Sequence, residues 1–293
     1  MQIKTNEIAL EVQEFGPADG PALILIRGLG SQLIHWPADL CIGLAERGFR
    51  TIIFDNRDVG LSQRCPTDQT PTDAARILQI SETGAPIPAA YTLNDMARDV
   101  VGLMDALKIE TAHVFGISMG GAIAQILCVD HADRLKSASI VMTSARLRTT
   151  QNNAGSILPT LLAKPVDHAT YVNNWVHEHA VHGSPGYPMP EQDIRAEADV
   201  AWSRGVDPDG NNRQVLALLT APDRRQNLTR INLPCQVIHG VDDALIPLSM
   251  GAEIAALIPD CDYHAIDGMG HIITPALAPT IVDLVDDFIQ RRG

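Results

Sequence analysis

Short apolar segments alternate with amphipathic stretches through the first half of the chain. The segment at residues 22–26 is continuously apolar, which is typical of a strand buried on both faces. Further strands are predicted at 50–54, 111–115 and 137–142. Because amphipathic stretches separate these strands, the pattern predicts a mostly parallel sheet with helices on both faces.

Two of the intervening helices have recognisable ends. A helix over residues 37–47 is predicted to end at Gly48, a residue favoured after the last turn. A second helix is predicted to begin at Thr92 and reach residue 107, with apolar residues at helical spacing. Thr92 and Asp95 have the form of a capping box, with Asp in place of the usual Glu.

The alternation is interrupted twice. Residues 65–91 are rich in Pro, Thr and Gly and are predicted to run over the surface. Residues 146–226 contain helical stretches and polar loops but no convincing strand. Strands are then predicted again at 235–239 and 263–266, with a helix after each. The second interruption therefore indicates a helical insertion.

The expected organisation is one α/β core with a helical cap. A length of 293 residues accommodates such a domain. The core is expected to comprise residues 1–145 and 227–293, and the cap, or lid, to comprise residues 146–226.

The chain is acidic, with a formal net charge of −13. Such a surface repels nucleic acid and anionic membranes. The N-terminal segment has no apolar signal-like run, and no stretch is long and apolar enough to span a membrane. The five cysteines are scattered without a C-x-x-C pair. We therefore expect a cytoplasmic protein with reduced thiols and with neither a nucleic-acid nor a membrane partner.

The segment Gly116-Ile-Ser118-Met-Gly120 matches G-x-S-x-G. It directly follows a predicted strand and precedes a predicted helix, which is the setting of the nucleophile elbow of α/β-hydrolases. There the Ser hydroxyl projects from a sharp turn, and the N–H groups at the start of the helix suit a developing oxyanion. Without that setting the motif is a common small-residue turn. Ser118 is the candidate nucleophile.

A serine nucleophile needs a base and an orienting acid. His271 lies in a glycine-rich loop between the last predicted strand and the last helix. The acid is expected after the preceding strand, where Asp242 and Asp243 are adjacent. The chain order of nucleophile, acid and histidine is that of the α/β-hydrolase fold.

The chain resembles α/β-hydrolases over nearly its whole length. In its sequence motifs it resembles bacterial carboxylesterases of the aclacinomycin-methylesterase type. This resemblance implies that Asp243 rather than Asp242 is the acid, and that no cofactor takes part. It also implies an oxyanion hole made by the backbone N–H groups of Leu29 and Met119. The matching segments are 27–30, 54–62, 116–121, 240–247 and 268–271.

Two positions depart from the family pattern. Arg27 stands where the first loop usually has His, which changes how that loop is braced but leaves the backbone donor at Leu29. Asp58 stands where Gly is usual, and Asp tolerates left-handed backbone better than most residues. Asp55 and Arg57, beside it, are interpreted as structural bracing.

Histidines are concentrated in the predicted cap, at 168, 177, 179 and 182. On a helix, His177 lies well round from the other two members of His-x-His-x-x-His, and no Cys or carboxylate pair completes a metal site. A solvated cap helix is the preferred interpretation, and no metal is expected.

The sequence predicts a hydrolase that cleaves carboxylic esters through an acyl-enzyme on Ser118, acting on a small-molecule ester. The same triad serves perhydrolases (cofactor-free haloperoxidases), lactonases and carbon–carbon bond hydrolases, and a ligand-binding relative without catalysis is a further alternative. The oligomeric state is left open, with a homodimer as one alternative.

Overall fold

Eight strands form one sheet in the order β1-β2-β4-β3-β5-β6-β7-β8. The computed structural model describes residues 1–66, 69–83, 86–146, 154–164 and 166–292. In this order, all neighbouring strands from β4 to β8 are parallel. Strand β1 pairs antiparallel with β2, and β2 pairs antiparallel with β4. The mostly parallel sheet is confirmed. The strands are β1 (Gln2–Thr5), β2 (Ile8–Phe15), β3 (Ala22–Ile26), β4 (Arg50–Phe54), β5 (Ala112–Ile117), β6 (Leu135–Val141), β7 (Cys235–Gly240) and β8 (Asp262–Ile266).

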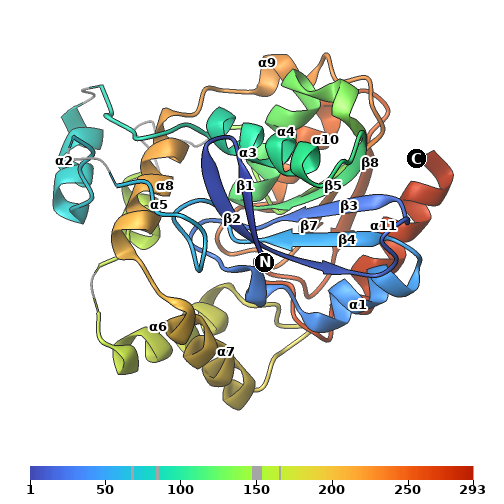
Figure 1. The fold of residues 1–293 in the computed structure, drawn as a ribbon. Helices are drawn as coiled ribbons and strands as arrows, with labels where there is room; N and C mark the ends of the chain where they lie inside the picture. The colour runs from blue at the N-terminus through green and yellow to red at the C-terminus, as the bar shows by residue number, and fades with distance from the viewer. Residues whose placement is uncertain (67–68, 84–85, 147–153, 165, 293) are drawn as a thin grey trace.

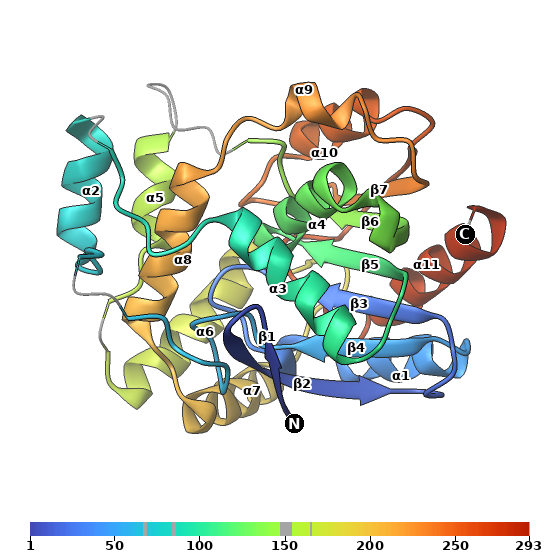
Figure 2. The ribbon, with the colours of Figure 1, turned by 45° about the horizontal axis from the view of Figure 1, so that its top comes forward.

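Helices cover both faces of the sheet, as Figures 1 and 2 show. One face carries α3, α4 and α10, and the other carries α1 and α11. Each predicted core helix is present within a few residues of its expected ends. The bounds are α1 (Ala38–Glu46), α3 (Leu93–Ala106), α4 (Met119–Asp130), α10 (Leu248–Leu257) and α11 (Ala278–Arg292), with a short α9 (Arg225–Leu228) and 3-10 turns at Leu33–His35 and Ala132–Arg134.

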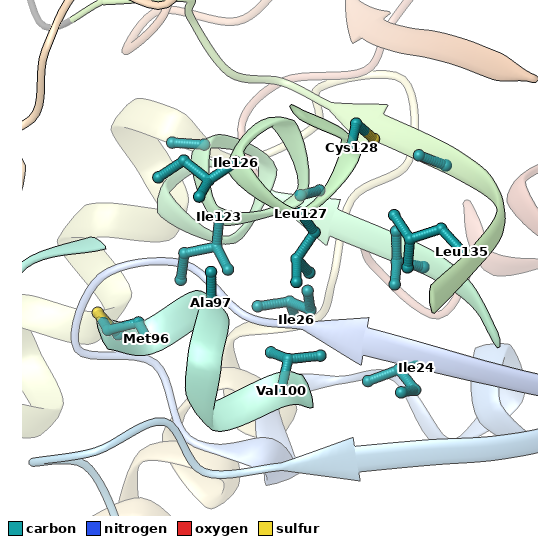
Figure 3. Packing of buried hydrophobic residues seen from close by; sticks show 14 of the residues in the cluster. Ile24, Ile26, Met96, Ala97, Val100, Ile123, Ile126, Leu127, Cys128 and Leu135 are labelled. Atoms are coloured by element: carbon teal, nitrogen blue, oxygen red, sulfur yellow. The ribbon is translucent and has the colours of Figure 1, made fainter. Parts of the chain in front are cut away.

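The larger core cluster lies between the sheet and helices α3 and α4 (Figure 3). Ile24 and Ile26 of β3 are fully buried there, together with Val100 of α3 and Ile123 of α4. Burying one such side chain contributes about 1.5–3 kcal/mol to folding. Because β3 packs continuously against helices, the loop that follows it is held in a fixed place.

The start of α3 is fixed by its predicted capping box. The Thr92 side chain accepts a hydrogen bond from the Asp95 backbone N–H at 3.3 Å, and the Asp95 carboxylate accepts one from the Thr92 N–H at 2.7 Å. These two bonds satisfy donors that a helix start leaves free. The prediction from residues 92 and 95 is confirmed.

The expectation of a plain surface excursion over residues 65–91 is wrong in part. Helix α2 (Ala74–Thr83) lies within it, and Ile77 is fully buried in a cluster with Leu158 and Val215. The helix forms because it finds an apolar partner surface in the inserted helices, which local composition does not reveal. Residues 67–68 and 84–85 lie outside the described residues.

Four helices of the described chain lie between β6 and the short helix α9, and we call residues 146–226 the insertion. No strand is present in its described part, which omits 147–153 and 165. Figures 1 and 2 show these helices, with α2, on the side of the molecule toward which the parallel strands point. They are α5 (Ala154–Leu161), α6 (His168–His182), α7 (Glu191–Arg204) and α8 (Pro208–Thr220).

Helix α6 is not a solvated helix at every histidine, which corrects the sequence-based interpretation. The His179 side chain is only 5% exposed and its ring meets Trp175 edge-on at 5.5 Å between centroids. Burial, and secondarily the charge of Arg27, lowers the pKa of His179 to about 4. The residue is buried because α6 packs along α7.

Candidate active site

Ser118 occupies a strained turn between β5 and α4. Its backbone has φ of 55° and ψ of −119°, a conformation that costs a non-glycine residue about 1–3 kcal/mol. A Cβ on Gly116 would lie 2.2 Å from the Gly120 carbonyl oxygen, and one on Gly120 would lie 2.1 Å from the Ile26 oxygen. Both glycines are therefore required by close backbone approach. The turn presents the Ser118 hydroxyl at the carboxyl end of the sheet.

The structure brings Ser118, His271 and Asp243 into one hydrogen-bonded line. His271 Nε2 lies 3.0 Å from Ser118 Oγ, and His271 Nδ1 lies 2.8 Å from Asp243 Oδ2. The three residues follow β5, β8 and β7. With Nδ1 protonated toward the carboxylate, Nε2 is free to accept the serine proton.

Asp243 is held as a carboxylate. Its Oδ1 accepts hydrogen bonds from the backbone N–H groups of Leu245 at 2.9 Å and Ile246 at 2.8 Å. Burial acts to raise the pKa of Asp243, but His271, His239 and the Ile246 N–H outweigh it and hold that pKa well below its usual range. Asp243 can therefore stabilise a positive charge on His271 without taking its proton.

Asp242 has a different role from its neighbour. Its Oδ2 accepts a hydrogen bond from the Gly268 N–H at 2.8 Å, and its own N–H donates to the Met269 oxygen at 3.0 Å. Asp242 thus fastens the loop that carries His271 without contacting the imidazole.

Leu29 and Met119, the predicted oxyanion donors, lie at the same cavity as Ser118. Both residues line it, and within the described chain neither N–H donates a hydrogen bond. The next residue, Gly30, is tied down by its N–H to Gln214 Oε1 at 2.8 Å. An oxyanion hole requires two free backbone donors of this kind near the reacting serine.

Arg27 does not place its charge in this cavity. Of the loop 27–30, only Leu29 is among the described residues that line it. The Arg27 guanidinium is buried instead over the Trp36 ring, 4.6 Å from the centroid. Burial lowers the pKa of Arg27 to about 10, partly offset by Glu197. Arg27, in place of the usual His, thus holds the loop 27–30 through its contact with Trp36.

Asp55 and Arg57 contact other parts of the protein rather than the cavity. Asp55 accepts hydrogen bonds from the backbone of Leu33 at 2.6 Å and also pairs with Arg204 of α7. Arg57 forms two 2.6 Å bonds to Asp99. These contacts support the interpretation of both residues as structural bracing.

Asp58 adopts the left-handed backbone conformation of a turn position where the family usually has Gly. Its φ is +70°, in the left-handed region as expected. Its carboxylate is fully buried and accepts two bonds from Arg213 of α8, at 2.9 and 2.8 Å, and one from Tyr91 at 2.6 Å. Asp58, in place of the usual Gly, therefore links the core to the insertion through Arg213.

The end of α6 clamps the loop that carries His271. The His271 N–H donates to the His182 oxygen at 2.7 Å. Ser184 Oγ donates to the Ile272 oxygen at 2.6 Å and accepts from the Gly270 N–H at 3.0 Å. No sequence pattern marks Ser184, because its partners lie more than 80 residues away.

Two neighbouring cavities share part of their walls. The first, of about 500 Å³, contains Ser118 and has a largely apolar wall that includes Leu161, Leu218 and Met250. The second has a volume of about 430 Å³. Leu29, Thr160 and Glu178 line both, so the insertion forms part of each wall.

The described residues contain no group of three or more His, Cys, Asp or Glu side chains arranged to hold a metal ion. Among the helices in the described part of the chain, none is long and apolar enough to cross a membrane.

The parallel sheet, the strained serine turn and the order of the three strand-end residues define the α/β class of hydrolase. Residues 21–274 match the family described as "alpha/beta hydrolase fold". The chain belongs to this family.

Similar proteins extend over almost the full chain. A putative carbamate hydrolase of Variovorax paradoxus is 28% identical and covers 96% of both chains. Rhodomycin D methylesterase of Streptomyces peucetius is 24% identical over 94% of this chain and 93% of its own, which confirms the predicted resemblance to that type of esterase. The enol-lactonase of Burkholderia xenovorans has the same fold, with a TM-score of 0.71, 23% identity and coverage of 99% and 100%.

Proposed function

We propose that this protein hydrolyses carboxylic esters of small molecules, with Ser118 as nucleophile, His271 as general base and acid, and Asp243 as the orienting carboxylate. The observation that carries the proposal is the unbroken contact from Asp243 through His271 to Ser118, at 2.8 and 3.0 Å. Both distances lie within the hydrogen-bond reach that an activated serine and its base require.

The reaction follows from these contacts. Ser118 Oγ attacks the ester carbonyl carbon while His271 Nε2 accepts its proton, and the carbonyl oxygen takes up negative charge between the N–H groups of Leu29 and Met119. His271 then donates the proton to the departing alcohol. A water molecule activated by His271 cleaves the acyl-enzyme and restores Ser118.

We further propose that the insertion acts as the cap that selects the substrate, since it supplies part of both cavity walls. The relatives are named for a carbamate, a methyl ester and an enol-lactone, and all three substrates present a carbonyl carbon to a nucleophile. Of these, the ester fits the methylesterase match and requires no additional group at the site.

The test is a panel of p-nitrophenyl esters, methyl esters and lactones assayed with wild-type protein and Ser118→Ala. We expect ester hydrolysis that falls by at least about 10³-fold in Ser118→Ala, and fluorophosphonate labelling that depends on Ser118. Ser203→Ala, at an exposed position on α7, is the matched control. Near-wild-type activity of Ser118→Ala would refute the proposal. A folded wild-type protein that neither reacts with fluorophosphonate nor turns over the panel would indicate a binding protein instead.

A further inference from the structure

Two arginines line the cavity that contains Ser118, although the protein as a whole is strongly acidic. Arg146 follows the carboxyl end of β6, and Arg224 follows α8 across the insertion. The formal net charge of the chain is −13, so a local excess of positive charge is not a general property of the surface. Within the described residues, no carboxylate lies within 4.0 Å of either guanidinium.

Arg224 is fixed in place by neutral acceptors. It donates to Gln125 Oε1 at 3.0 Å, to the Ser144 oxygen at 2.9 Å and to the Pro222 oxygen at 3.3 Å. These bonds satisfy donors without cancelling the charge, and burial lowers the pKa of Arg224 to about 10. The charge of the neighbouring Asp223 offsets the effect of burial only in part, and a buried cation that is partly compensated favours a further anion nearby.

Arg146 has donor capacity that the described chain leaves unused. Its Nε is buried and has no hydrogen-bond partner among the described residues, although a buried donor without a partner costs about 1–3 kcal/mol. The nearby Asp223 does not neutralise it, because that carboxylate is bound by Arg225 at 2.6 and 3.0 Å. A ligand that accepts this bond would remove the cost.

The acidic group on the cavity wall does not serve either arginine. Glu178 of α6 lines the cavity, but its carboxylate lies 3.6 Å from His182. Asp223 acts on both guanidiniums from outside the cavity wall, and the rest of their positive charge is available to a ligand in the cavity with Ser118.

We propose that Arg146, supported by the charge of Arg224, binds a carboxylate on the substrate, so that the preferred ester is one carrying a free carboxylate away from the bond that is cleaved. A guanidinium matches a planar carboxylate with parallel N–H donors. The apolar part of the wall suits the hydrocarbon between the carboxylate and the ester. The inference rests on the proposed ester hydrolysis, whose substrate class it specifies.

The experiment compares methyl half-esters of succinate, glutarate, adipate and pimelate with the corresponding methyl esters that end in a carboxamide. The carboxamide has the same shape without the charge. We expect kcat/KM to favour the carboxylate by about tenfold or more at one or more of these lengths. Arg146→Gln should bring the ratio close to one, and Arg146→Lys should retain part of the preference.

Arg195→Gln is the matched control, because Arg195 is an exposed arginine of α7 that pairs with Glu191, and its ratio should equal that of the wild type. Equal kcat/KM values for carboxylate and carboxamide at every length would overturn the inference, as would a preference that persists in Arg146→Gln.

Binding of the free dicarboxylates to Ser118→Ala, followed by calorimetry, tests the site independently of turnover. Binding that weakens about tenfold or more in Ser118→Ala/Arg146→Gln supports the inference even if the proposed hydrolysis fails. Binding of equal strength with and without Arg146 overturns it even if simple esters are hydrolysed.

Discussion

At the scale of single residues, Asp242 and Asp243 have different roles because adjacent side chains point to different partners. Asp243 turns inward, where two backbone N–H groups and His271 meet its carboxylate. Asp242 points to the Gly268 N–H instead. Asp243 therefore orients the His271 imidazole, and Asp242 fastens the loop that carries it.

Exchanging each carboxylate for an amide separates these two roles. Asp243→Asn should lower kcat by about 10⁴-fold, because an amide cannot stabilise the imidazolium and favours the wrong tautomer. Asp242→Asn should lower it by less than about tenfold, because an amide oxygen still accepts from Gly268. Steady-state kinetics on one ester measures both, and equal losses would contradict the assignment of Asp243 as the acid.

Asp58 shows how a departure from a family pattern can be stabilising. Asp58→Gly relieves a positive φ of 70° but removes the buried carboxylate that Arg213 contacts at 2.9 and 2.8 Å, leaving the guanidinium with Asp207 at 3.2 Å. We expect a net loss of about 3 kcal/mol in the free energy of unfolding, since breaking a buried pair outweighs the relief of backbone strain. Chemical denaturation measures this loss.

The comparison for that variant is Asp260→Gly, where φ is 53° and the carboxylate is exposed. There the strain is relieved with little lost, so the two substitutions should differ clearly. Equal effects would show that the contact of Asp58 with Arg213 contributes little.

At the scale of elements, α6 reaches from the insertion to the loop that carries His271. The end of this helix and Ser184 bind the backbone of residues 270–272 from both sides. The position of His271 therefore depends on how the insertion packs. Under the proposed function, we therefore expect a residue of the insertion to affect catalysis through the position of His271.

Ser184→Ala should lower kcat by about tenfold or more with little change in KM, because a displaced His271 weakens proton transfer but leaves the cavity walls intact. Ser184→Thr retains the hydroxyl and should recover much of the loss. Ser203→Ala removes a hydroxyl from exposed α7 and should have no effect. If KM rose while kcat stayed constant, Ser184 would belong to the binding wall instead.

The sequence predicted those helices and strands whose stabilising partners are close along the chain or recur periodically. The capping box at residue 92 and the apolar run at 22–26 gave accurate bounds because their partners are adjacent or periodic. Strands β1 and β2 and helix α2 were not predicted. Strand β2 pairs with β4, β1 packs against α3, and α2 packs against the insertion, and these contacts are distant along the chain.

At the scale of the whole molecule, buried histidines couple stability to pH. Burial lowers the pKa of His113 and of His179 to about 4, and that of His35 well below its usual value. Between about pH 6.5 and pH 4 the unfolded chain binds protons that the folded chain does not. The free energy of unfolding should therefore fall as the pH is lowered through this window.

Replacing one of these histidines should reduce that dependence. His113→Gln removes a ring that contacts Ser137 Oγ at 2.8 Å, and the variant is expected to be less stable at pH 7. Its stability should change with pH by about one proton less than that of the wild type, or about 1.4 kcal/mol per pH unit near pH 5. Denaturant titrations from pH 7 to pH 4 measure this slope, and parallel curves would contradict the role of His113.

By itself the sequence determined the sheet of α/β type, the elbow at Ser118 and the chain order that leads to His271, because each depends on local spacing or on the order of segments. Tertiary structure decided the rest. It brought Asp243, the residue that the resemblance favours, to within 2.8 Å of the imidazole, turned Arg27 away from the cavity and joined α6 to the His271 loop. It also placed Arg146 and Arg224 on one wall with Ser118. These outcomes required long-range packing, because groups separated by many residues meet only when the sheet and the insertion close around the site.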